Sequence, residues 1–197
     1  MWTHSLPSGH YLTAIINSIF VNLAFCVTWQ ISQEKESYLT ARQFFNECGI
    51  VAYGDDHIVT VPTYFSDKFN QLLMPQLMEQ IGLGYTMEEK ERVADQPFRP
   101  ITEISYLKRR FVFDEDRQIW LAPLALETVL ESPMWNHKCP DPNDQTFCQI
   151  ENSIRELSLH ETAIWNKWHK VFVRCAQKLG YYTQFVKHTE TRAFVLD

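Results

Sequence analysis

Positive charge is scarce in this 197-residue sequence. Eighteen lysines and arginines stand against 24 aspartates and glutamates, and the formal net charge is −6. This balance argues against a simple basic nucleic-acid-binding module, although an acidic protein can still bind phosphates through metal ions. Any basic surface for a polyanion must therefore be local.

The five cysteines include no CxxC pair, and their odd number leaves one unpaired under any disulfide scheme. This pattern is typical of a reducing compartment. Zinc binding by His137, Cys139 and Cys148 is a weaker interpretation than ordinary packed or exposed side chains. The sequence also lacks a signal peptide after Met1, an internal repeat and a low-complexity tract.

Apolar residues are plentiful, at 45% hydrophobic and 14% aromatic. That is enough to bury a sizeable core in one or two globular units. The most apolar segment, residues 14–29, is short for a bilayer and contains Asn17, Ser18 and Asn22. It predicts a buried helix and not a membrane span.

The stretch GIVAYGDDHIVTV, residues 49–61, predicts a β-hairpin. Two β-branched runs flank Gly54, Asp55 and Asp56, and a glycine suits the tight connection between strands. Because both runs are nearly continuously apolar, we expect the hairpin to be covered on both faces with the acids at its exposed tip. Taken alone, Asp-Asp after glycine indicates a polar turn more often than a metal site.

Helices are expected on both sides of this hairpin, at residues 36–49 and 64–82. Pro75 either kinks the second helix or begins a new one, and Gly82 ends it. Residues 103–124 then predict a second hairpin, with its turn at 114–116.

From Pro123 onward the pattern is helical. One helix is expected to begin at Asn143 or Asp144, and Ser158 with Glu161 forms a capping-box pattern for the next. Three tryptophans of this part are expected in the core: Trp135, Trp165 and Trp168. The sequence thus predicts an α+β part over residues 1–119 and a helical part over residues 120–197.

A second group of candidate residues lies in the stretch SLPSGHYLTAIINS and comprises Ser8, Gly9, Thr13 and Asn17. Thr13 and Asn17 are one helical turn apart and share a face. Gly9 permits close backbone approach, and hydroxyl and amide groups suit a sugar or phosphate. The competing interpretation is an N-cap serine before a helix with two internally satisfied polar residues.

The order of these two stretches resembles motif B followed by motif C of viral RNA-directed RNA polymerases, and looks most like the dicistrovirus and iflavirus type of picorna-like viruses. IGLGYTMEEK resembles motif D, and SYLKRRF resembles motif E. The resemblance implies a partial right-hand palm over residues 1–119, made of loop-helix, catalytic hairpin, helix and second hairpin. It implies a mainly helical thumb over residues 120–197.

The resemblance also implies template-directed RNA synthesis from ribonucleoside triphosphates in viral genome replication. Asp55 and Asp56 would hold two Mg²⁺ ions, or alternatively Mn²⁺, since hard cations prefer oxygen ligands and in-line phosphoryl transfer uses two of them. Lys90 would donate a proton to departing pyrophosphate.

The remaining roles implied by the resemblance concern substrate and RNA. Ser8, Gly9, Thr13 and Asn17 would bind the nucleotide, with Asn17 sensing the 2′-hydroxyl, and Tyr53, Gly54, Lys108 and Arg109 would contact RNA or primer. Strand alternation sends Lys108 and Arg110 one way and Arg109 the other, so Lys108 is the better primer contact.

The expected partners are an RNA template and primer, ribonucleoside triphosphates, a viral protein primer and other replication proteins. The family's motif A, with another aspartate, and its basic motif F should lie upstream of motif B. We therefore expect this chain to be inactive alone and to work with the fingers and motif A of a longer polymerase, on membranes of the host cytoplasm. Two alternatives stay open: a non-catalytic remnant captured in a host genome, and a reverse transcriptase-like DNA polymerase.

Overall fold

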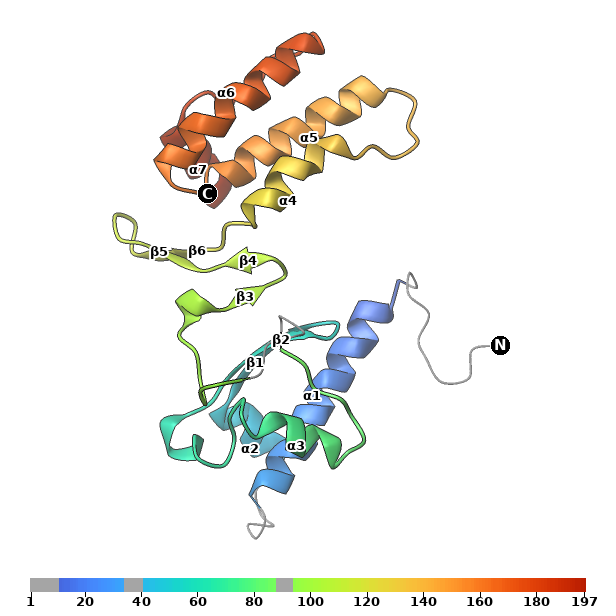
Figure 1. The fold of residues 1–197 in the computed structure, drawn as a ribbon, viewed down its shortest axis with the longest axis vertical. Helices are drawn as coiled ribbons and strands as arrows, with labels where there is room; N and C mark the ends of the chain where they lie inside the picture. The colour runs from blue at the N-terminus through green and yellow to red at the C-terminus, as the bar shows by residue number, and fades with distance from the viewer. Residues whose placement is uncertain (1–10, 34–40, 88–93) are drawn as a thin grey trace. The chain divides into compact units, whose positions relative to one another are not determined.

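A computed structural model describes residues 11–33, 41–87 and 94–197. The chain divides into two compact units, Met1–Pro100 and Ile101–Asp197, and each is considered by itself (Figure 1). Both units combine helices with short antiparallel hairpins, so the predicted α+β class is confirmed. The division concerns packing, and the assignment of palm to residues 1–119 and thumb to 120–197 stays a prediction.

The first unit is built around one long helix and one hairpin. Its elements are α1 (Thr13–Ser32), α2 (Ala41–Glu47), β1 (Gly49–Tyr53), β2 (Asp56–Thr60), the 3₁₀ turn η1 (Thr63–Phe65) and α3 (Met74–Glu79). The predicted long helix over residues 64–82 is wrong. A new helix does begin at this point, as one of the two interpretations predicted, but α3 starts at Met74, and Pro75 is its second residue, where the missing N–H still costs nothing.

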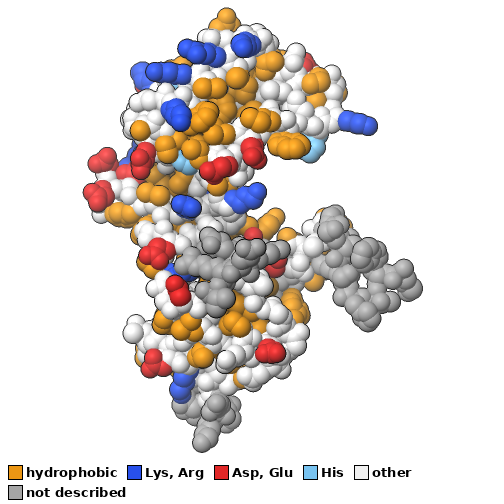
Figure 2. Space-filling model, viewed as in Figure 1, with side chains coloured by type: hydrophobic (Ala, Val, Ile, Leu, Met, Phe, Trp, Pro, Cys, Tyr) orange, Lys and Arg blue, Asp and Glu red, His pale blue; other side chains and the backbone are white. Residues whose placement is uncertain are grey.

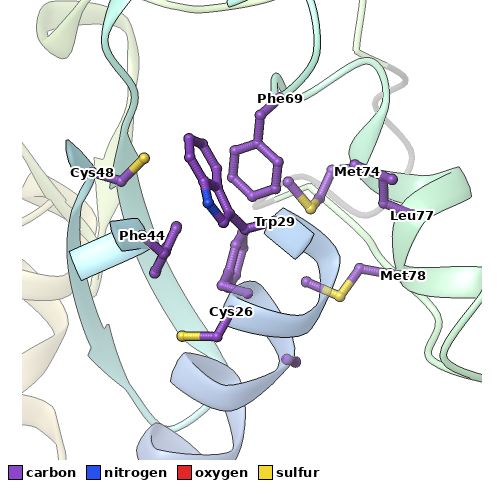
Figure 3. Packing of buried hydrophobic residues seen from close by; sticks show 10 residues of the cluster. Cys26, Trp29, Phe44, Cys48, Phe69, Met74, Leu77 and Met78 are labelled. Carbon is purple, nitrogen blue, oxygen red and sulfur yellow. The ribbon is translucent and has the colours of Figure 1, made fainter. Parts of the chain in front are cut away.

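Aromatic rings form the core of the first unit (Figure 3). Trp29 of α1 is fully buried, and its ring centroid lies 5.8 Å from that of Phe44 and 5.2 Å from that of Phe69. Met74, Leu77 and Met78 of α3 close the same cluster. Truncating a buried tryptophan of this kind to alanine costs about 3–5 kcal/mol.

The prediction that the first hairpin is covered on both faces is wrong. Ile50 and Val59 pack against the core, whereas Val51 and Tyr53 on the other face are 60% and 59% exposed. The pairing of Ile50 with Val59 and of Val51 with Ile58 shows that opposite residues share a face. Within the described residues of this unit, α1 covers one face of the hairpin, and the face of Val51 and Tyr53 is exposed.

The prediction that residues 14–29 form a buried helix holds only for the second half of α1. Phe25 and Trp29 are buried there, whereas six large apolar residues are exposed, five nearer the start of the helix and Val27 between the two buried rings: Ile15, Ile16, Ile19, Phe20, Leu23 and Val27. By length and composition α1 is the one helix among the described residues apolar enough to cross a membrane. Its second half instead lies in the core of the first unit.

The second unit begins with two small hairpins, where the sequence predicted one. These are β3 (Ser105–Tyr106) with β4 (Arg109–Arg110), and β5 (Val112–Asp114) with β6 (Ile119–Leu121), after the 3₁₀ turn η2 (Ile101–Glu103). Leu107 and Lys108 both have positive φ, which closes the first hairpin in two residues, as in a type I′ turn. The predicted turn at 114–116 is the start of the second connection, in which Asp114 accepts bonds from the N–H groups of Asp116 and Arg117.

Helices make up the rest of the second unit: α4 (Leu126–Glu131), η3 (Ser132–Met134), α5 (Pro142–Leu157), α6 (Thr162–Lys178) and α7 (His188–Leu196). The helix expected to start at Asn143 or Asp144 starts at Pro142, because Asp141 caps it by accepting bonds from two backbone N–H groups. Ile154, Leu157 and Trp165 lie in the core between α5 and α6.

Two further expectations for this unit are wrong. Ser158 does not cap α6 but follows the end of α5, where its hydroxyl donates to the Arg155 carbonyl, and Glu161 precedes α6 without a side-chain cap. Trp165 is buried as expected, but Trp135 is 72% exposed because it follows η3 in an irregular loop.

Candidate catalytic and nucleotide-binding site

The two aspartates lie at the two-residue turn of the first hairpin. Tyr53 pairs with Asp56, which leaves Gly54 and Asp55 as the connection. Gly54 has a φ of 66°, while Asp55 is not among the residues with positive φ. A glycine at the first central position with positive φ is the pattern of a type II′ turn, the geometry that suits the twist of a hairpin. The turn therefore presents both carboxylates to solvent on a short, regular support.

Two side chains hold this turn against the rest of the first unit. The Ser18 hydroxyl of α1 accepts a bond of 2.9 Å from the Gly54 N–H and donates one of 2.7 Å to the Ala14 carbonyl. His57 Nδ1 lies 2.8 Å from the Asp55 carbonyl oxygen. The position of the turn is thus set from α1 on one side and from β2 on the other.

His57 is largely buried behind the turn. Burial lowers its pKa below the ordinary value of 6.5, while the Asp55 carbonyl and then the carboxylates of Asp56 and Asp55 act in the opposite direction. A neutral ring is therefore the expected state at neutral pH.

The carboxylates of Asp55 and Asp56 are suited to hard cations. Within the described residues neither accepts a hydrogen bond or forms an ion pair, so their oxygens are available. Mg²⁺ and Mn²⁺ take oxygen donors of this kind. No group of three His, Cys, Asp or Glu side chains that could hold a metal occurs in the described part of the chain. Asp55 and Asp56 fit a metal site as two of its ligands and need others to complete it.

The predicted nucleotide-binding residues divide between described and undescribed parts of the chain. Thr13 and Asn17 lie one turn apart at the start of α1, both half-buried. Asn17 makes no side-chain hydrogen bond to another residue within 11–33, 41–87 and 94–197, which leaves its amide available. Ser8, Gly9 and Lys90 lie outside the described residues.

The two basic residues predicted to bind RNA have different environments in the structure. Lys108 is exposed in the turn of the β3–β4 hairpin, and the Ala125 N–H donates to its carbonyl at 2.8 Å. The strand alternation assumed for Lys108 is therefore wrong, since Lys108 lies outside the strands. Arg109 forms a bidentate ion pair with Glu156 of α5, at 2.9 and 2.8 Å, and also donates to the Ala122 carbonyl. Its guanidinium thus has a structural partner inside the second unit.

The sequence interpretation missed a basic stripe on α6. Four cations lie on one exposed face of this helix, and α6 contains no acidic residue: Lys167, Lys170, Arg174 and Lys178. Figure 2 shows lysine and arginine side chains gathered over α6. The spacing of three, four and four residues was the available signal for it. Ser18 and His57 were missed for other reasons. The hydrogen-bond partner of Ser18 lies 36 residues away in the sequence, and His57 bonds a backbone carbonyl, which residue types do not reveal.

Comparison with known proteins places the chain among viral polymerases. The family model of viral RNA-dependent RNA polymerase matches residues 2–185. The replicase polyprotein of acute bee paralysis virus is 34% identical over 185 residues, covering 90% of this chain and 10% of that polyprotein. The replicase polyprotein of cricket paralysis virus is 31% identical over 170 residues, covering 85% of this chain and 10% of that polyprotein.

A solved structure gives the same assignment of fold. The RNA-dependent RNA polymerase of a sicinivirus has a TM-score of 0.64 to this chain at 17% identity, over 93% of this chain and 36% of that one. The chain spans about a tenth of the length of these polyprotein relatives. The predicted resemblance to the picorna-like polymerases is confirmed, and the chain belongs to the viral RNA-dependent RNA polymerase family.

Proposed function

We propose that this chain supplies Asp55 and Asp56 as metal ligands for the addition of ribonucleotides to an RNA 3′ end. The observation that supports the proposal is the type II′-like turn, which presents two carboxylates that form no ion pair within the described residues and is bonded to α1 through Ser18 and Gly54. Divalent ions, when bound, supply activation of the attacking hydroxyl and charge neutralisation at the leaving pyrophosphate. Asp55 is the direct ligand in this proposal, and Asp56 assists at the second ion or the primer end.

The other residues bind substrate and RNA. Asn17 and Thr13, with Ser8 and Gly9 before them, contact the ribose and phosphates of the incoming nucleotide. A site that hydrogen-bonds the 2′-hydroxyl rejects the deoxy analogue, because its own polar groups are then left unpaired. This selection favours ribonucleotides and argues against the reverse transcriptase alternative. Lys90 is the proposed proton donor to pyrophosphate.

RNA contacts are proposed for both units. Tyr53, which is exposed beside Asp56, and Gly54 hold the turn against RNA. Lys108 contacts the primer strand, and Arg109 supports it by fixing the hairpin to Glu156. The basic stripe on α6 binds RNA phosphates, since four exposed cations without a neighbouring acid on the helix are complementary to a polyanion.

We propose that synthesis requires the rest of a longer polymerase. The turn provides only two carboxylates, and the exposed apolar residues of α1 together with Val51 and Tyr53 leave a large apolar surface uncovered in the first unit. Surfaces of that kind mark contacts with other protein segments. The fingers and the motif A segment are the proposed partners. Primer extension by the isolated 197-residue chain, lost in Asp55→Asn, would contradict this requirement.

Asp55→Asn in the complete polymerase tests the proposed function directly. The substitution keeps the size of the side chain and removes a charged ligand, so nucleotide incorporation should fall by at least a hundredfold without a change in thermal unfolding. Asp67→Asn is the matched control, since Asp67 is an exposed aspartate of the same unit. Equal incorporation by both variants would refute the metal assignment.

The family relationship connects the activity with infected host cells, because the relatives are viral replicase polyproteins. A protein primer and membrane-associated replication complexes stay predictions. The nucleotide sequence upstream of Met1 tests the captured-remnant alternative. An open reading frame that continues into a D-x-x-x-x-D segment supports the polymerase, and host exons or stop codons support the remnant.

A further inference from the structure

Three separate segments of the first unit meet at His57. Its ring packs edge-on against Phe25 of α1, with 4.8 Å between ring centroids and 64° between planes. Nδ1 lies 2.8 Å from the Asp55 carbonyl oxygen at the turn. Nε2 lies 3.3 Å from the hydroxyl of Tyr85, which belongs to the segment after α3. His57 is therefore in contact with the helix of Asn17, with the aspartate turn and with the segment that leads toward Lys90.

The chemistry of these partners assigns the hydrogen bonds. A backbone carbonyl can only accept, so Nδ1 carries the proton and donates to Asp55. In the neutral ring Nε2 is then an acceptor, and the Tyr85 hydroxyl donates to it. Each nitrogen of His57 thus has one partner, and the two bonds fix both the tautomer and the plane of the ring.

The bond to Asp55 acts on both proposed metal ligands at once. The carbonyl that His57 holds belongs to the planar peptide unit joining Asp55 to Asp56. Fixing the orientation of this unit constrains ψ of Asp55 and φ of Asp56, and so the directions in which both side chains leave the backbone. Ser18 constrains the opposite end of the turn through the Gly54 N–H. Ligands displaced by a fraction of an ångström bind a metal less well, so a held peptide matters for catalysis.

We propose that His57 is a positioning residue of this polymerase. It holds the peptide unit between Asp55 and Asp56 in a fixed orientation relative to Tyr85 and α1. The inference rests on the proposed function of Asp55 and Asp56 as metal ligands. The competing explanation is a largely buried histidine that only fills space next to Phe25. The two explanations differ in what a ring without nitrogens would do.

His57→Phe in the complete polymerase tests the proposal. Phenylalanine keeps an aromatic ring beside Phe25 and removes both hydrogen bonds. We expect kcat for nucleotide incorporation to fall about tenfold and the Mg²⁺ concentration for half-maximal activity to rise about threefold or more, with KM for the nucleotide changed less than twofold. The midpoint of thermal unfolding reports whether the fold is retained. A space-filling role predicts no change in kcat or in the Mg²⁺ requirement.

Two more variants separate the bonds of His57. His57→Asn places an amide N–H near the position of Nδ1, so it should recover most of the lost kcat and restore the Mg²⁺ requirement. Tyr85→Phe removes the partner of Nε2 and leaves the Nδ1 bond in place, so it should lower kcat about threefold, with no further loss when combined with His57→Phe. If His57→Phe does not fold, Tyr85→Phe and His57→Asn still test the proposal.

The outcomes distinguish this inference from the proposed function. Wild-type kcat and Mg²⁺ dependence in folded His57→Phe, beside an inactive Asp55→Asn, would overturn the positioning role and leave the metal assignment intact. Failure of His57→Asn to exceed His57→Phe would also overturn it. Full activity of Asp55→Asn would instead remove the proposed function itself.

Discussion

The Ser18 hydroxyl of α1 accepts a hydrogen bond of 2.9 Å from the backbone N–H of Gly54. The two residues lie 36 positions apart, and Gly54 is buried in the turn. Because Asn17 precedes Ser18 and Asp55 follows Gly54, this bond connects the proposed ribose-sensing helix with the proposed metal-binding turn. It explains how two motifs that are separate in sequence can form one site.

Ser18→Ala should destabilise the first unit and displace the turn. The substitution leaves the buried Gly54 N–H without its partner, which costs about 1–3 kcal/mol. Urea unfolding of the chain measures this change. Ser32→Ala is the matched control, because Ser32 lies on the same helix and donates to the nearby Trp29 carbonyl. Equal destabilisation by the two variants would remove the special role of the Ser18–Gly54 bond.

Asn17→Ala should weaken the choice of ribonucleotides over deoxynucleotides. The half-buried amide is available at the start of α1, and its loss removes the hydrogen bond proposed to sense the 2′-hydroxyl. The ratio of kcat/KM for the two nucleotides, measured in the complete polymerase, should fall at least tenfold. Asn22→Ala is the control, since the Asn22 amide donates to the Ser18 carbonyl within α1. An unchanged ratio in Asn17→Ala would refute ribose sensing by this residue.

Neutralising the basic stripe on α6 should weaken RNA binding and reduce its salt dependence. Each lost contact with a single-stranded phosphate lowers the slope of log K against log salt by about 0.7. Lys170→Gln with Arg174→Gln therefore predicts a slope shallower by about 1.4 for a single-stranded oligoribonucleotide. Arg117→Gln with Lys138→Gln makes the same change of net charge at exposed positions outside α6. If both double variants alter the slope equally, α6 is not a specific RNA surface.

Arg109→Lys should destabilise the second unit although it conserves charge. Lysine cannot reproduce the planar fork that bonds both carboxylate oxygens of Glu156. The two side chains are 35% and 30% exposed, so solvent reduces the coupling, and we expect about 1 kcal/mol in a double-mutant cycle with Glu156→Gln. The exposed pair of Lys187 and Glu190 should show no resolvable coupling in the same measurement. Absence of coupling for Arg109 and Glu156 would contradict its structural role.

Local sequence determined the elements that depend on neighbouring residues. Glycine before two aspartates, between β-branched runs, is sufficient for the hairpin and its turn. The uninterrupted apolar segment without glycine or proline is sufficient for α1, and Pro75 marks the start of α3 because proline suits a first helical turn. The ordered motifs around these elements were also sufficient for the family, which the comparisons confirm.

Where two local interpretations competed, the local pattern did not identify the correct one. Ser158 and Glu161 have the spacing of a capping box, yet Ser158 follows the end of α5. Residues 103–124 form two hairpins because Leu107 and Lys108 adopt positive φ, which neither residue type favours. Pairing of β3 with β4 stabilises this turn, and the partner of a strand cannot be identified from a run of aromatic and branched residues.

Only the tertiary structure decided how the site is held. It showed that α1 covers one face of the hairpin, that Ser18 bonds Gly54, that His57 joins Asp55 to Tyr85 and that Arg109 is paired with Glu156. The physical reason is the same in each case. A side chain's polar group bonds whichever partner the fold brings within about 3 Å, and that partner is set by packing between distant segments. The residue types of the site were thus present in the sequence, while their support was determined by the fold.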